Sequence, residues 1–113
     1  MSNGLEQSER RQWPRFHLTS IARLRVNRNG IEHYLSGSCH ELSLGGALLI
    51  VNHELRLGEE LQLRIELPYS SPVHLNGLVR SRHNHEYGIE FTALSDEARE
   101  RLNRNCTSLA LLD

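Results

Sequence analysis

The chain has few cysteines and no excess of positive charge, and both absences exclude familiar classes of protein. Its 113 residues contain two cysteines, Cys39 and Cys106. Two thiols make neither a disulfide framework nor a zinc set, so we expect both to be reduced and buried. The net charge of -1 argues against a general nucleic-acid binder, which would normally be distinctly basic. We therefore expect no nucleic-acid polymer among its partners.

Long apolar segments are also missing. The longest apolar run covers residues 47–51, far short of the ~20 residues that cross a membrane. Residues 1–9 are polar and lack the apolar core of a signal peptide. The sequence thus predicts no membrane span, a cytoplasmic location, a flexible leader over residues 1–9 and one domain over residues 10–112.

Alternation of apolar and polar residues predicts six short strands, at residues 22–26, 31–35, 47–51, 61–67, 73–79 and 87–91. Asn29-Gly30 is a strong hairpin signal, and Gly77 indicates a bulge. We expect residues 37–46 to form a loop and the opening of a strand. The run at 47–51 is apolar on both faces, so we expect it to be buried between layers or beneath a helix.

A helix is predicted after the last strand. Ser95 is a suitable N-cap, and Asp96 and Glu97 favour the positive end of the helix dipole. Apolar residues then recur on one helical face, at Ala98, Leu102, Cys106 and Leu109. The fold class is therefore all-β with a C-terminal helix, as a small antiparallel barrel on which the helix packs.

Two short motifs carry the chemistry of the chain: RQWPR at residues 11–15 and ELSLGG at residues 41–46. Arginine pairs with guanine O6 and N7 or with phosphate oxygens. The Glu41 carboxylate can accept from the N1–H and N2–H donors of guanine, and glycine lets backbone approach a ligand closely. Because Pro14 fixes its own φ and biases Trp13 towards extended geometry, residues 10–16 are expected to form a turn or extended loop. The two motifs suit a ligand that carries purine edges and phosphates.

In this order, the motifs resemble those of the PilZ domain, a bacterial receptor for cyclic di-GMP. That family has R-x-x-x-R and, two strands later, [D/N]-x-S-x-x-G. Here Arg11 and Arg15 match the first motif, with Arg10 before them, and Ser43 and Gly46 match the second. The resemblance covers about residues 9–110 and extends to later landmarks, at Leu57-Gly58, Leu67-Pro68 and Tyr87-Gly88-Ile89-Glu90-Phe91.

The resemblance implies a six-stranded antiparallel β-barrel of the split-barrel type, no catalysis and no cofactor besides the ligand. Arg11 and Arg15 would contact guanine and phosphate, Ser43 would hydrogen-bond the ligand, and Gly46 would permit close approach. Cyclic di-GMP and a protein effector are the expected partners, and a homodimer is left open. The predicted ligand-binding residues are Arg10, Arg11, Arg15, Glu41, Ser43, Gly45 and Gly46.

Position 41 departs from the family pattern, because Glu replaces Asp or Asn. Its extra methylene adds one rotor to freeze, at a cost of roughly 0.5–1 kcal/mol, so we expect weakened binding. Glu41 could instead pair with Arg11 or Arg15 in the ligand-free protein. A separate alternative for the function, which the departure at Glu41 favours, is a ligand-free adaptor that acts through protein interactions in pilus or flagellar control.

Two further site types receive little support. His83 and His85 share one loop, but no third ligand is evident, so no metal site is expected. Ser43 lies near His40 in the sequence, but nothing orients such a pair for nucleophilic catalysis, and no glycine-rich phosphate loop precedes a helix. We therefore expect no enzymatic activity.

Overall fold

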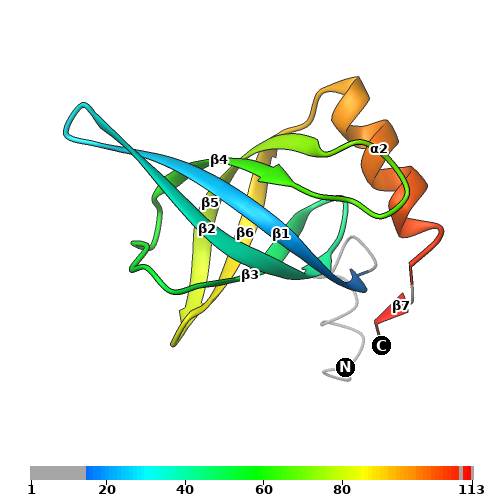
Figure 1. Ribbon diagram of the computed structural model, residues 1–113, viewed down its shortest axis with the longest axis horizontal. Helices are drawn as coiled ribbons and strands as arrows, with labels where there is room; N and C mark the ends of the chain where they lie inside the picture. Colours follow the sequence, from blue (N-terminus) through cyan, green and yellow to red (C-terminus); the bar gives the residue numbers. More distant parts are fainter. Residues whose placement is uncertain (1–14, 110, 113) are drawn as a thin grey trace, which may run out of the picture.

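Six antiparallel strands close into a barrel, and one helix packs beside the β4–β5 connection (Figure 1). The computed structural model describes residues 15–109 and 111–112. Around the barrel the strands follow the order β1-β2-β3-β6-β5-β4, and β4 closes on β1. The elements are β1 (Arg15–Arg28), β2 (Ile31–Leu42), β3 (Gly46–Val51), β4 (Glu60–Ile65), β5 (Val73–His83), β6 (Glu86–Ala93), α2 (Asp96–Cys106) and the two-residue β7 (Leu111–Leu112), which pairs with the start of β1.

Alternate residues of every barrel strand fill the interior, as the period-two pattern predicts. The fully buried members include Ala22, Leu24, Val26, Leu42, Leu49, Val51, Ile65, Val73, Val79 and Tyr87. Burial of each large apolar side chain stabilises the fold by about 1.5–3 kcal/mol. The Tyr87 hydroxyl accepts from Leu55 N–H at 3.1 Å and donates to the His53 carbonyl, so its one polar atom is satisfied.

The turn and cap signals of the sequence are confirmed. Asn29 and Gly30 have φ angles of 55° and 81°, the left-handed pair that a tight two-residue hairpin needs. The register between β5 and β6 shifts at Gly77, where a bulge was predicted. Ser95 caps α2 by accepting from Ala98 N–H at 3.0 Å.

Asn105, which the sequence pattern did not single out, fastens the helix to the barrel. Its buried amide accepts from Tyr69 N–H at 2.9 Å and donates to the Ser70 hydroxyl and the Arg101 carbonyl. Arg101 in turn donates to the Pro72 carbonyl. These bonds satisfy the polar groups of the β4–β5 connection, which would otherwise be costly to bury.

Two boundary predictions are wrong. Residues 37–42, predicted as part of a loop and strand opening, continue β2. Gly37 allows this pairing with β3, because any side chain at this position would collide with the Ile50 carbonyl. The helix ends at Cys106, so Leu109 lies beyond it. The loop predicted around His83 and His85 is confirmed as a short turn, since β5 ends at His83 and β6 begins at Glu86.

The interpretation of residues 47–51 as buried on both faces is also wrong. Ala47, Leu49 and Val51 face the interior, whereas Leu48 and Ile50 are half-buried on the outer face. Leucine and isoleucine at these positions predict burial from the sequence, but only one face of each barrel strand points into the core. The predicted leader, residues 1–9, lies outside the described residues.

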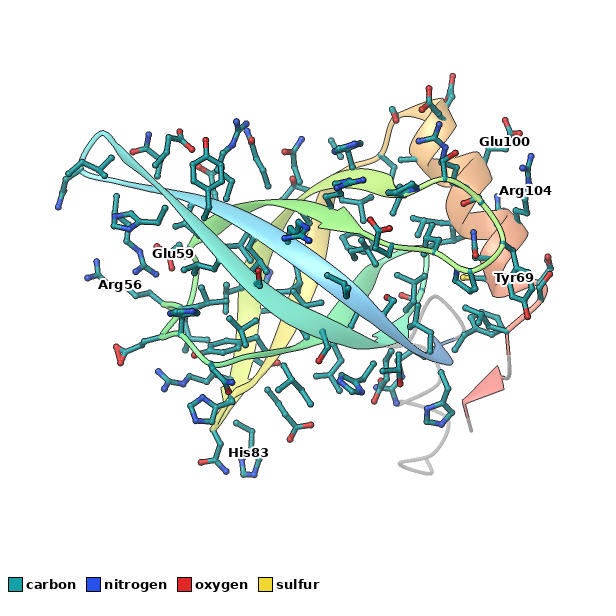
Figure 2. All side chains as sticks on the ribbon, viewed as in Figure 1. Arg56, Glu59, Tyr69, His83, Glu100 and Arg104 are labelled. Atoms are coloured by element: carbon teal, nitrogen blue, oxygen red, sulfur yellow. The ribbon has the colours of Figure 1, made fainter. Side chains whose placement is uncertain are left out.

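An ion pair fixes the far end of the β1–β2 hairpin. Arg28 donates to Glu59 through Nε at 2.7 Å and through Nη2 at 2.9 Å, in a two-pronged contact. Glu59 also accepts from Arg56 N–H, and Figure 2 shows Arg56 and Glu59 beside each other at this end of the barrel. The pair ties β1 to the β3–β4 connection. The one helix of the described chain is too short and polar to cross a membrane.

Candidate functional site

Arg15 and Glu41 are held together by the register between β1 and β2. Arg15 is the first residue of β1, and His17, two residues on, pairs with Glu41. Arg15 and Glu41 are therefore diagonal neighbours on one face of the sheet. Arg15 Nη1 donates to Glu41 Oε1 at 2.9 Å. Arg15 was predicted to lie in a loop; that prediction is wrong, because the residue already pairs with β7 as strand.

Arg15 also carries an unsatisfied donor. Its Nε is buried, and within residues 15–109 and 111–112 it has no hydrogen-bond partner. A buried donor without an acceptor costs about 1–3 kcal/mol. An acceptor supplied by a ligand would remove that cost.

Ser43 shapes the short turn between β2 and β3. Its hydroxyl oxygen accepts from Gly45 N–H and Gly46 N–H, both at 3.1 Å, and the hydroxyl donates to the Gly46 carbonyl at 3.3 Å. The residue is 7% exposed. The Ser43 hydroxyl thus uses, to hold the turn, the same donor and acceptor capacity that a hydrogen bond to a ligand would require.

Glycines form the floor of a hollow on the outer face beside this turn. A Cβ at Gly46 would lie 2.1 Å from the Ile89 carbonyl oxygen, so only glycine allows β3 to approach β6 here. Gly88, opposite Leu48 on β6, would place a Cβ 2.3 Å from Ser81 Oγ. Because both positions lack side chains, the surface sinks between β3 and its neighbours.

A second ion pair lies on the far rim of this hollow. Arg80 of β5 donates to Glu90 Oε1 through Nε at 2.8 Å and through Nη2 at 2.6 Å. Both side chains are more than half exposed, so the pair contributes little to stability and is easily exchanged for another partner.

We call this depression the β3–β6 hollow. Its volume is about 440 Å³, and its lining comes from the starts of β1 and β3, the end of β2, and β5 and β6. The charged side chains of the described lining balance, with two arginines and two glutamates. The lining residues that the argument uses are Arg15, Glu41, Ser43, Gly45, Gly46, Leu48, Arg80, Gly88 and Glu90.

Five of the seven residues predicted to bind ligand therefore meet at one place: Arg15, Glu41, Ser43, Gly45 and Gly46. Arg10 and Arg11 lie outside the described residues, as does Trp13. The structure adds Leu48, Arg80, Gly88 and Glu90. Gly88 and Glu90 belong to the last-strand landmark, but Arg80 has no local signal, because only the pairing of β5 with β6 brings it to the hollow.

The histidines form no comparable centre. His40 Nε2 lies 2.7 Å from Ser38 Oγ, so it is paired with Ser38 rather than with Ser43. Over the part of the chain that the structure describes, no three histidine, cysteine, aspartate or glutamate side chains gather as a metal site.

Comparison with known proteins gives one family. The family model of the PilZ domain matches residues 9–108. The structure resembles the PilZ domain of Escherichia coli YcgR with cyclic di-GMP, with a TM-score of 0.70 and 17% identity over 88% of this chain and 91% of that one. It also resembles the PilZ domain of CeSA from a cellulose-synthesizing bacterium, with a TM-score of 0.60 and 18% identity over 80% and 91% of the two chains.

A longer structure shares the same fold in one part. The Bacillus subtilis inhibitor of motility (MotI/DgrA) matches with a TM-score of 0.67 and 16% identity, over 87% of this chain and 50% of that one. No curated protein matches the chain.

Proposed function

The chain belongs to the PilZ domain family, and from this premise we propose that it is a receptor that binds cyclic di-GMP in the β3–β6 hollow. Similar structures include complexes of YcgR with cyclic di-GMP. The observation that carries the proposal is the meeting of Arg15, Glu41 and the turn at Ser43 around one hollow. These residues come from two motifs that are 26 positions apart at Arg15 and Glu41.

The chemistry of each group fits this ligand. The Arg15 guanidinium offers donors to a phosphate or to guanine O6 and N7, and its buried Nε supports the need for one more acceptor. Glu41 would accept from guanine N1–H and N2–H. The Ser43 hydroxyl keeps the turn in shape. Gly46 and Gly88 line the hollow with backbone, so that no side chain rises from its floor towards a flat base.

The charge of the hollow must be matched to that of the ligand. A dianionic ligand needs net positive charge, whereas the described lining is neutral. We propose that Arg10 and Arg11 supply that charge, and that Arg80 leaves Glu90 to contact a phosphate. Because the Arg80–Glu90 pair is exposed, its exchange for a phosphate costs little.

Signalling would follow from contacts of Arg10, Arg11 and Arg15 with the ligand, which would change the surface around the hollow. The altered surface would then act on a protein effector, and a receptor for an intracellular messenger would work in the cytoplasm. We assign no catalytic role to the hollow, because the Ser43 hydroxyl is bound within its own turn and His40 is paired elsewhere.

One observation favours a second candidate, an adaptor that works without ligand. Glu41 already binds Arg15 at 2.9 Å, and the Ser43 hydroxyl is satisfied internally. A site whose donors and acceptors are paired with one another has less to gain from a ligand. The adaptor would keep the barrel and use its surface for protein contacts.

Titration calorimetry with cyclic di-GMP separates these two functions. We expect micromolar or tighter binding and, at ~100 times Kd, a stabilisation of about 2.7 kcal/mol visible as a raised Tm. GMP at the same concentrations is the control, because it carries one base and one phosphate only. Absence of heat and of any Tm shift up to ~100 μM cyclic di-GMP would rule out the receptor and leave the adaptor.

A further inference from the structure

The β1–β2 hairpin extends past the barrel. β2 begins to pair with β3 only at Gly37, and β1 pairs with β4 only over residues 22–25. Over residues 26–36 the two strands therefore pair only with each other, although Val26 is still buried in the core and Arg28 is held by Glu59. We call this part of the hairpin the arm, and Figure 1 shows its tip projecting beyond the other strands at the upper left. A strand of which six residues have only one neighbour is unusual, because unpaired edges are normally short or protected.

The backbone of this arm offers hydrogen bonds on its free side. The two-residue turn makes Arg28 and Ile31 the first pair of the hairpin, joined by hydrogen bonds. Alternation along the ladder then turns the N–H and C=O groups of Glu32, Tyr34 and Ser36 away from β1. In the described chain no strand lies on that side of them.

The side chains of the arm do not protect this edge. Residues 31–36 contain no lysine, arginine or proline, and the irregularities in β2 pairing occur beyond them. Tyr34 and Ile31 are 74% and 62% exposed. Glu32, the one acidic group, is already engaged by Arg25 at 3.4 Å and by Asn27 at 3.2 Å on its own hairpin.

We propose that this edge pairs with the same edge of a second copy of the chain. A two-fold axis at His33 would set the strands antiparallel, with Glu32 opposite Tyr34 of the second copy and Ile31 opposite Leu35 of the second copy. The opposed Glu32 and Tyr34 both carry outward backbone groups, so the two symmetric pairs form four hydrogen bonds. The two neighbouring registers are excluded. An axis at Glu32 would place the two Glu32 carboxylates opposite each other. An axis at Tyr34 would place Ile31 of the second copy opposite Gly37, a position that Val51 of β3 already occupies.

The two faces of the resulting four-stranded sheet are self-complementary. On the inner face, Ile31 reaches Leu35 of the second copy, which packs against the barrel core. On the outer face, Tyr34 lies between its own cross-strand neighbour Arg25 and Glu32 of the second copy. Each outer row thus places Tyr34 between one arginine and one glutamate, with no like charges opposed, and the exposed isoleucine gains a buried position.

Sedimentation of the full chain in reductant, from about 5 μM to 1 mM, tests the pairing. Because the interface is small, we expect the average mass to rise from 13.0 kDa towards twice that value near ~100 μM. Tyr34→Pro removes an outward N–H and no hairpin bond, so it should weaken association by about thirtyfold and leave Tm near that of wild type. Tyr34→Phe is the matched control and should associate like wild type.

A cysteine at the proposed axis tests the register. His33→Cys should form an intermolecular disulfide on mild oxidation, because residues at a non-hydrogen-bonded pair have Cα atoms ~4.5 Å apart. Gln62→Cys, exposed on β4, should not. A wild-type chain that stays at 13.0 kDa at 1 mM overturns the proposal and leaves the edge to an extended segment of another protein. Equal association of Tyr34→Pro, or dimers without a His33→Cys disulfide, overturns it as well.

Discussion

Arg15 at the start of β1 donates to Glu41 near the end of β2 at 2.9 Å, and this ion pair joins the two sequence motifs. The pair is partly buried, with 37% and 22% of the two side chains accessible, so a ligand can still reach both groups. The same two groups are the donor and the acceptor that a guanine nucleotide would use. Substitutions can show whether the ion pair positions both groups for the ligand or competes with the ligand for them.

Arg15→Ala should weaken cyclic di-GMP binding by about 5- to 150-fold, because a charge-assisted or bidentate pair is worth roughly 1–3 kcal/mol. Calorimetry measures the change. Arg82→Ala is the control, since Arg82 lies over the Tyr87 ring and outside the hollow. Equal affinity of Arg15→Ala and wild type would show that Arg15 is not a ligand contact.

Glu41→Ala should also weaken binding, because guanine N1–H and N2–H lose their acceptor. Glu41→Asp should bind as tightly as wild type or tighter, since it restores the shorter carboxylate of the family motif. Both are measured by the same titration. Tighter binding by Glu41→Ala would mean that Glu41 restrains Arg15 in the ligand-free protein instead of contacting the base.

Gly46→Ala should destabilise the barrel by at least about 1–3 kcal/mol, because the new Cβ meets the Ile89 carbonyl oxygen at 2.1 Å and backbone cannot yield cheaply. Urea unfolding measures the loss. Gly88→Ala is the matched comparison: its neighbour is the Ser81 hydroxyl, so adding Ser81→Ala should restore most of the stability. A fully stable Gly46→Ala would contradict the close approach of β3 and β6.

Stability should depend on pH through Glu59. The hydrogen bonds from Arg28 lower the pKa of the Glu59 carboxyl, against an opposing effect of burial. The resulting stability is present above the unfolded-state pKa of about 4.3 and is lost as the pH falls through the lower folded value. Glu59→Gln should therefore cost about 1–3 kcal/mol at pH 7 and progressively less as the pH falls below about 4.3.

Thermal or urea unfolding from pH 3 to pH 8 checks this difference. Glu100→Gln serves as control, because the exposed Glu100–Arg104 pair on α2 should contribute at most about 0.5 kcal/mol. A Glu59→Gln penalty that stays constant over this range would refute the assigned role of Glu59.

Both cysteines should resist alkylation in the native protein. Burial raises the pKa of Cys39 to about 12 and that of Cys106 to about 11, so at pH 8 few thiolates exist to react. Iodoacetamide should label neither thiol before unfolding and both after it, as mass spectrometry would show. Rapid native labelling of Cys39 would contradict its place in the core.

The barrel could be predicted well from the sequence, because the signals for its strands and turns lie in residues close together in the chain. Alternation at residues 22–26 and 61–65, the Asn29-Gly30 turn and the Ser95 cap each depend on neighbours within a few positions. The extension of β2 to Leu42 could not be predicted, since Gly37 reads as a loop signal until β3 is placed against it.

The site was half predictable for the same reason. The β2–β3 turn is written in consecutive residues, and Ser43 and Gly46 could be recognised there. Arg80 and Glu90 reach the hollow through the β5–β6 register, which a sequence pattern does not reveal. The direct pairing of Glu41 with Arg15 was foreseen as an alternative, and the structure confirms it.

Closure of β1 against β4 also governs the order in which the molecule can be made. β1 finds its first partner at once in β2, but its second partner is distant: Ala22 pairs with Ile65, more than forty residues later in the chain. The hollow is completed even later, because Gly88 and Glu90 of its lining belong to the last barrel strand. A nascent chain therefore has no ligand site until nearly all of the barrel has emerged, and folding dominated by such distant pairings is slow.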